Sequence, residues 1–111
     1  MKHILSYKGL WVREPRKIRL ISYDSITHIE CNEGISELKM GKKTVKKLHI
    51  PLSLLEKKFP SDQFFRTHRN YIVNKKFVKA YNRGSPEVLC AGDARIPIAR
   101  RRRKDFNHFI Q

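Results

Sequence analysis

Three basic side chains stand among large apolar residues in the stretch FFRTHRNYIVN (64–74), and their nitrogens could bind an anionic ligand. The guanidinium groups of Arg66 and Arg69 suit guanine edges and phosphate oxygens, and His68 adds an imidazole. Apolar residues on both sides would anchor the segment in a core while the basic groups face outward. We favour a ligand-binding role for Arg69. For His68 a structural role is favoured, and Arg66 is open to both interpretations.

A second cationic group follows near the C-terminus, where residues 100–103 are four consecutive arginines. Four cations at the start of a predicted helix oppose the helix dipole, at about 0.3–1 kcal/mol each. This arrangement predicts phosphate groups nearby and adds Arg100, Arg101 and Arg102 to the candidate binding residues. A solvent-exposed charged face is the alternative.

Residues for other kinds of chemistry are sparse. Cys31 and Cys90 form no CxxC pair and no zinc-type cluster with histidine, so we expect two unpaired thiols in a reducing cytoplasm. Glu30 and Glu33 are three residues apart but flank a predicted turn, with no partner for acid–base catalysis. A phosphate-binding glycine loop is absent from the sequence. We therefore expect no enzyme, no metal and no cofactor.

The composition points to a polyanionic partner. The 111 residues fit one domain and carry 25 Lys+Arg against 10 Asp+Glu, a net charge of +15 with a pI near 10.3. DNA, RNA and an anionic membrane are the candidates. The N-terminus lacks the features of a signal peptide, and no apolar run is long enough to span a bilayer.

The elements that must position these residues are mainly short strands. Two segments have helical patterns, 51–59 and 100–111, and they lie too far apart for a helix-turn-helix. Residues 66–70, between Phe65 and Ile72, are predicted to form a turn or irregular segment, with Asn74 bonding nearby backbone at its far end. The alternating strand patterns cover 17–23, 26–31, 35–40, 44–50, 88–90 and 95–98.

The stretch FFRTHRNYIVN closely resembles the F-x-R-x-H-R-S-Y-x-V-N signature of the LytTR DNA-binding domains of bacterial response regulators. The similarity extends over about residues 17–107 and includes a strand over 77–79 and the ending Pro97-Ile98-Ala99-Arg100-Arg101. It implies a mainly β fold of small antiparallel sheets with a short helix and a C-terminal helix. It also implies that loops enter successive major grooves of duplex DNA, often at direct repeats upstream of promoters.

The resemblance also implies three DNA-contacting positions. The first is Ser36, with Ile35 and Asn32 nearby; the second is Arg69; the third is Arg101, with Arg100 as the alternative register. The chain departs from the family pattern in three places. Ile35 replaces the usual aromatic residue, Asn70 replaces a serine, and Ala99 replaces a serine that could cap a helix.

The predicted organisation is a DNA-binding domain over 17–111, preceded by a strand-forming extension over 1–16 that packs on it. That extension is too short to hold a receiver domain, so a sensor or receiver protein is a candidate partner. Dimerisation on DNA is compatible with this scheme, and we expect no membrane partner. The alternatives are a small RNA-binding or ribosome-associated β protein, and a protein-binding module that has lost DNA binding.

Overall fold

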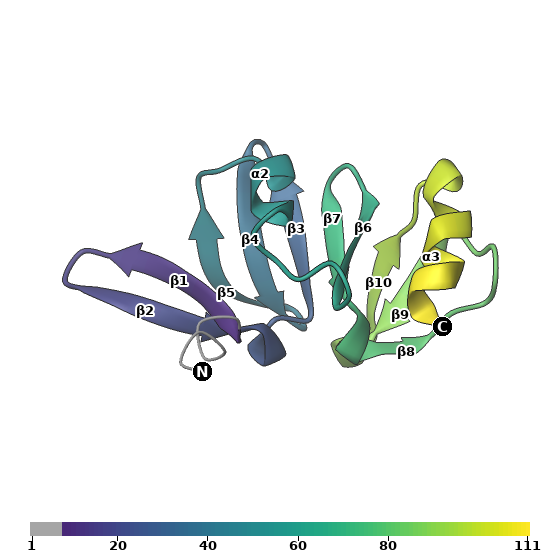
Figure 1. Cartoon of the computed structure of the whole chain (residues 1–111), viewed down its shortest axis with the longest axis horizontal. Coiled ribbons are helices and arrows are strands. Elements are labelled where there is room, and N and C mark those ends of the chain that lie inside the picture. The colour runs from purple at the N-terminus through teal and green to yellow at the C-terminus, as the bar shows by residue number, and fades with distance from the viewer. Residues whose placement is uncertain (1–7) are drawn as a thin grey trace.

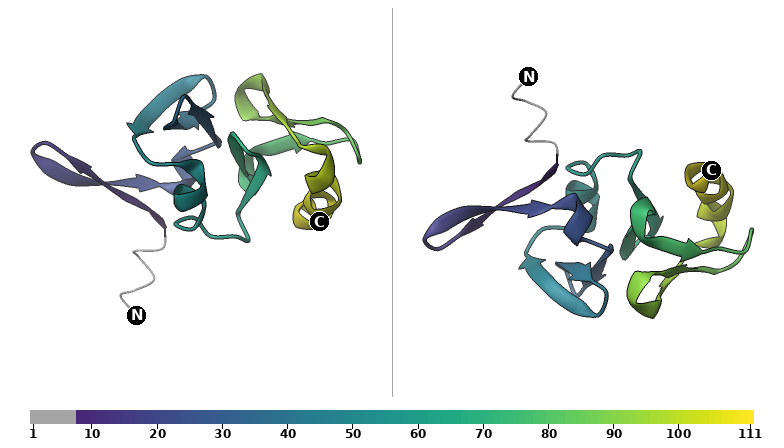
Figure 2. Two further views of the ribbon diagram at one scale, coloured as in Figure 1. Left: turned by 90° about the horizontal axis from the view of Figure 1, so that it is seen from above. Right: turned by 90° about the horizontal axis from the view of Figure 1, so that it is seen from below.

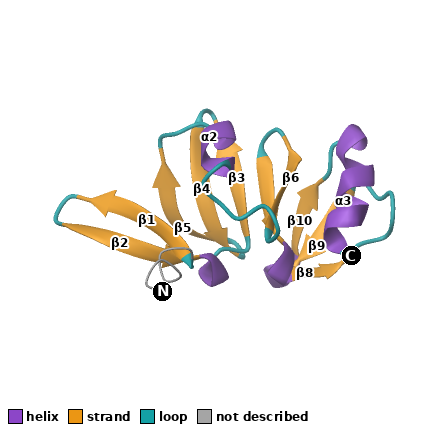
Figure 3. Cartoon of the chain, in the orientation of Figure 1, coloured by secondary structure: helices purple, strands orange, loops and turns teal. Residues whose placement is uncertain are grey.

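A computed structural model describes residues 8–111, in which strands dominate (Figures 1 and 3). The helical elements are α2 (Leu52–Glu56), α3 (Arg103–Ile110) and the 3₁₀ turns η1 (Tyr23–Ser25), η2 (Lys75–Phe77), η3 (Ala91–Asp93) and η4 (Arg100–Arg102). The strands are β1 (Gly9–Glu14), β2 (Lys17–Ser22), β3 (His28–Asn32), β4 (Ile35–Met40), β5 (Lys43–Leu48), β6 (Phe64–His68), β7 (Tyr71–Asn74), β8 (Val78–Ala80), β9 (Glu87–Cys90) and β10 (Ala94–Pro97). The expected mainly β fold with small antiparallel sheets is confirmed.

The central sheet has five strands in the order β5-β4-β3-β7-β6, all antiparallel to their neighbours. Both predicted strands of the β4–β5 hairpin are present, and Gly41 lies in the turn between them. Along β4, Ser36 and Leu38 are buried while Glu37 and Lys39 are only partly covered, as period-two alternation predicts.

Two smaller sheets flank the central one. Strands β1 and β2 form a two-stranded ribbon that projects at one end of the molecule, and α3 lies at the other end (Figure 2). Strands β10, β9 and β8 form the third sheet, in that order. Pro97 lies on the edge strand β10, as expected for a residue that cannot donate to a ladder. Residues 1–7 of the predicted extension lie outside the described residues, and the proposed boundary after residue 16 stays a prediction.

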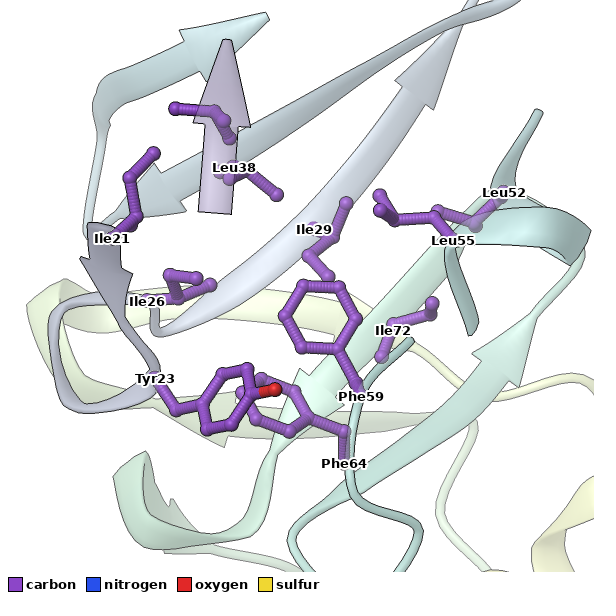
Figure 4. Packing of buried hydrophobic residues seen from close by; sticks show 11 residues of the cluster. Ile21, Tyr23, Ile26, Ile29, Leu38, Leu52, Leu55, Phe59, Phe64 and Ile72 are labelled. Atoms are coloured by element: carbon purple, nitrogen blue, oxygen red, sulfur yellow. The ribbon is translucent and has the colours of Figure 1, made fainter. Parts of the chain in front are cut away.

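The apolar residues form two clusters that meet at the central sheet. On β7, Ile72 belongs to the cluster with α2 and the ribbon, whereas its neighbour Val73 belongs to the cluster with the third sheet and α3. Adjacent strand residues point to opposite faces, so β7 contributes to both clusters. Figure 4 shows the first cluster, in which the rings of Tyr23, Phe59 and Phe64 pack with centroids 4.7–5.6 Å apart.

Two local predictions are corrected by the structure. The helix expected over 51–59 is only the five residues of α2, although Phe59 is buried as its apolar pattern predicts. The irregular segment expected over 66–70 is wrong, because β6 continues to His68 and only Arg69 and Asn70 form the turn. Pairing with β7, including a register shift between Arg66 and His68, keeps these basic residues in the sheet.

Asn74 has the local role that was predicted for it. Its side-chain oxygen accepts a hydrogen bond from the Lys76 amide at 3.0 Å and caps η2. Its amide nitrogen donates to the carbonyls of Tyr23 at 3.0 Å and Ile26 at 2.8 Å. This buried side chain therefore joins two segments that lie about fifty residues apart in the sequence.

Candidate nucleic-acid interface

Three loops that carry predicted contact residues lie along one edge of the molecule, the upper edge in Figure 1. They are the β3–β4 turn, the β6–β7 turn and the segment from β10 through η4 into α3. We call this edge the loop edge. The turns β4–β5 and β9–β10 lie on the opposite edge. Antiparallel pairing produces this arrangement, because alternate connections between strands fall on the same side of a sheet.

The β6–β7 turn presents Arg69 to solvent and is supported by its neighbours. The Asn70 amide donates to Nδ1 of His68 at 3.1 Å, and the His68 ring packs edge-on against Tyr71 with centroids 5.7 Å apart. Because Nδ1 accepts this bond, the neutral His68 ring carries its proton on Nε2. These contacts stabilise the turn, and a DNA contact by His68 stays a prediction.

Arg66 also supports the turn through hydrogen bonds to its carbonyls. Its guanidinium donates to the Arg69 carbonyl at 2.6 Å and to the His68 carbonyl at 3.3 Å, and it pairs with Glu56 at 3.2 Å. These bonds use its ε and both η nitrogens within the fold. The structural interpretation of Arg66 therefore fits the geometry better than a DNA contact.

The β3–β4 turn differs from the prediction at Ser36. That side chain is fully buried, and its hydroxyl donates to the Ile50 carbonyl at 2.8 Å. A DNA contact by Ser36 is inconsistent with this burial, so we exclude it from the candidate interface. Asn32 is exposed at the end of β3, and the turn residues Glu33 and Gly34 follow it.

The third loop contains the arginine run in two different environments. Arg100 and Arg101 are exposed, whereas Arg102 is half-buried and donates to the Arg66 carbonyl at 3.2 Å. The Ala99 amide donates to the Thr67 carbonyl at 2.8 Å, so two hydrogen bonds tie this loop to β6. The second and third loops therefore form one connected support, with Arg69, Arg100 and Arg101 left on its surface.

No side chain caps the helical segment that begins at residue 100. Ala99 occupies the cap position of η4 without a side-chain hydrogen bond, as its replacement of a serine predicts. Phe106 is fully buried and anchors α3, with its ring 4.8 Å from that of Tyr81. Packing of this apolar face, rather than a cap, holds the helix against the third sheet.

Burial shifts the ionisation of several side chains in the sheets. Burial lowers the pKa of His28 below its ordinary value, and the hydrogen bond at 3.2 Å to Glu30 only partly offsets this effect. Burial, followed by the nearby Glu30 carboxylate, raises the pKa of Tyr71. Cys31 and Cys90 are both unpaired thiols, as expected, and burial raises the pKa of Cys90 to about 12.

Among residues 8–111, no group of three or more His, Cys, Asp or Glu side chains is placed to bind a metal ion. In the same part of the chain, no helix is both long and apolar enough to cross a bilayer.

Comparisons with known proteins agree with the fold. Residues 16–111 match the family model described as the LytTr DNA-binding domain. The sensory transduction protein LytR of Staphylococcus haemolyticus (strain JCSC1435) is 29% identical over 98 residues, covering 85% of this chain but only 38% of the relative. A solved structure, the LytTr DNA-binding domain of a putative methyl-accepting/DNA response regulator from Bacillus cereus, is similar with a TM-score of 0.76. That similarity covers 93% of this chain and 96% of the solved one at 17% identity, and it shows the fold alone.

Proposed function

Because the chain belongs to the family of LytTr DNA-binding domains, we propose that it binds specific duplex sequences as part of a bacterial transcription regulator. The family is one of DNA-binding domains and not of enzymes. The observation that supports the proposal for this chain is the loop edge. Its three loops carry four exposed side chains that suit base edges: Asn32, Arg69, Arg100 and Arg101.

The dimensions of the molecule fit a groove-reading role. Its longest extent is 44 Å, and one turn of B-DNA is about 34–36 Å. This extent includes the β1–β2 ribbon, so the entry of the three loops into successive major grooves rests on the family to which the chain belongs. Arg69 and Arg101, or Arg100 in the alternative register, would hydrogen-bond to guanine edges, while Asn32 suits adenine.

The remaining cations would bind phosphates. With a net charge of +15, the chain attracts DNA of any sequence, and the arginines on the loop edge then fix its position. The support given to the turn by Arg66 and His68 favours binding, because side chains on an already ordered loop lose less entropy.

The wider setting is also a proposal. The chain spans 38% of the length of the curated relative it matches. We propose that a sensor or receiver, in a longer chain or in a partner protein, controls its binding. We propose direct repeats upstream of promoters as the target, with dimerisation on DNA, in the cytoplasm. The comparisons give no support to the RNA-binding alternative.

The test begins with selection of bound duplexes from a randomised DNA library at one stated salt concentration. The selected duplex is then compared in gel shifts with a scrambled duplex and with single-stranded RNA of the same length. We expect the selected duplex to bind at least a hundredfold more tightly than either competitor. Equal or tighter binding of RNA would replace this proposal with the RNA-binding alternative.

A further inference from the structure

Glu33 lies at the tip of the β3–β4 hairpin, on the loop edge. Asn32 pairs with Ile35, so the connection has only two residues, Glu33 and Gly34. Their φ angles are 49° and 80°, and a two-residue turn of type I′ requires positive values at both positions. Glycine adopts such an angle freely and asparagine tolerates it, but glutamate is strained there.

The second observation is the environment of the Glu33 carboxylate. Seven of the ten carboxylate side chains in the chain lie within 3.9 Å of a lysine, arginine or histidine nitrogen. Among residues 8–111, the three without such a partner are Glu33, Asp62 and Asp105. Only Glu33 is at the tip of a loop that would enter a groove, where DNA phosphates would repel it.

A donor in the groove would compensate for this repulsion. In the major groove, cytosine presents an exocyclic amino group with no acceptor on the same base, and a carboxylate accepts from it. Adenine also presents an amino group, but its N7 acceptor lies beside it and repels a carboxylate. Guanine and thymine present only acceptors to such a group, apart from the thymine methyl. Cytosine is therefore the base that suits an unpaired Glu33.

We propose that Glu33 accepts a hydrogen bond from the amino group of a cytosine and sets the base preferred beneath the β3–β4 turn. This inference rests on the proposed function. It gives the first loop a base contact beside that of Asn32, after the exclusion of the buried Ser36. It also gives the carboxylate a second effect, because repulsion from phosphates weakens binding wherever no cytosine is in place.

The main test compares the base preferences of variants by selection from a randomised duplex library. The wild-type protein should select cytosine at one position, and Glu33→Gln should shift that position toward adenine, which glutamine reads through N6 and N7. We expect a change of roughly tenfold in the ratio of the two bases. Asp62→Asn is the matched control, because Asp62 is exposed, unpaired within residues 8–111 and close to the start of β6, away from the loop edge.

A second variant separates recognition from folding. Glu33→Asn relieves the backbone strain, so its midpoint of unfolding should stay level or rise, while the cytosine preference is lost. An unchanged cytosine preference in both Glu33 variants, with the rest of the selected motif intact, would overturn the inference alone. If the wild-type protein selects no motif at all, the proposed function and this inference both fail.

Discussion

Arg66 donates to the carbonyls of His68 and Arg69, and Nδ1 of His68 accepts from the Asn70 amide. Arg69 is the exposed cation of this β6–β7 turn. An N–H group that donates to the backbone of the turn cannot also donate to a base, so the Arg66 donors on the two carbonyls are not available to DNA. The three basic residues of the stretch FFRTHRNYIVN therefore separate into two that build the turn and one that it presents.

A substitution of Asn74 tests the hydrogen bonds that join two distant segments of the chain. Asn74→Ala removes the donor to the carbonyls of Tyr23 and Ile26 and the cap on the Lys76 amide. Buried carbonyls left without a donor should lower the free energy of unfolding by about 2–4 kcal/mol in urea denaturation. The control Asn82→Ala, at an exposed position, should change it by less than about 0.5 kcal/mol. Similar losses in both variants would contradict the assigned role.

His28 gives a prediction for pH. Its folded-state pKa is lowered by burial, so the unfolded chain binds the proton more readily below the ordinary pKa of 6.5. Stability from this group is present above that value and is lost as the pH falls below it. The free energy of unfolding should thus decrease between pH 7 and pH 5, with a smaller slope in His28→Gln. An identical slope in both proteins would show that His28 is not the cause.

At the scale of elements, the turns at the edge opposite the loop edge connect two sheets. A Cβ atom added to Gly92 would lie 3.0 Å from the Gly41 Cα, so the β9–β10 turn packs backbone to backbone against the β4–β5 turn. Together with β7, which contributes to both apolar clusters, this contact fixes how the third sheet sits on the central one.

A matched pair of variants isolates that contact. Gly92 and Gly84 have φ angles of 78° and 79°, but a Cβ at Gly84 meets nothing within 4 Å. Alanine at either position costs about 1–2 kcal/mol for its backbone conformation. Gly92→Ala should cost about 1–3 kcal/mol more than Gly84→Ala in urea denaturation, because the turns must move apart. Equal costs would mean that the two turns separate freely.

The elements also show which features could be predicted from sequence. The β4–β5 hairpin follows from alternation and Gly41, and the edge position of β10 follows from Pro97, because these are local properties. The burial of Ser36 depends on the Ile50 carbonyl fourteen residues away, and the use of Arg66 depends on Glu56 on α2. Long-range contacts of this kind leave no periodic pattern in the sequence.

The turn expected over 66–70 is shorter in the structure for a related reason, because β6 continues to His68. Its basic residues suggested exposure, but pairing with β7 and the bond from Arg102 to the Arg66 carbonyl hold it in the sheet. Glu33 is not among the predicted contacts, because DNA phosphates repel a carboxylate. The Gly34 that follows it was the available sign that Glu33 lies at the tip of a tight turn.

At the scale of the whole molecule, two kinds of positive charge have to be distinguished. Arg69 sits on an ordered turn of the loop edge, whereas Lys57 is an exposed lysine that follows the short helix α2. An arginine that reads a guanine edge contributes to the difference between specific and non-specific affinity. A lysine near phosphates contributes to both alike and to the dependence on salt.

The central claim is tested most directly by paired salt titrations, on the selected duplex and on scrambled DNA, of wild type, Arg69→Ala and Lys57→Ala. Arg69→Ala should narrow the gap between the two affinities by about 1–3 kcal/mol. Lys57→Ala should leave the gap unchanged and reduce the salt slope by at most about one. If Arg69→Ala instead weakens binding to both duplexes equally, while the protein stays folded, Arg69 contacts only the backbone and the account of the loop edge as a base-reading surface is contradicted.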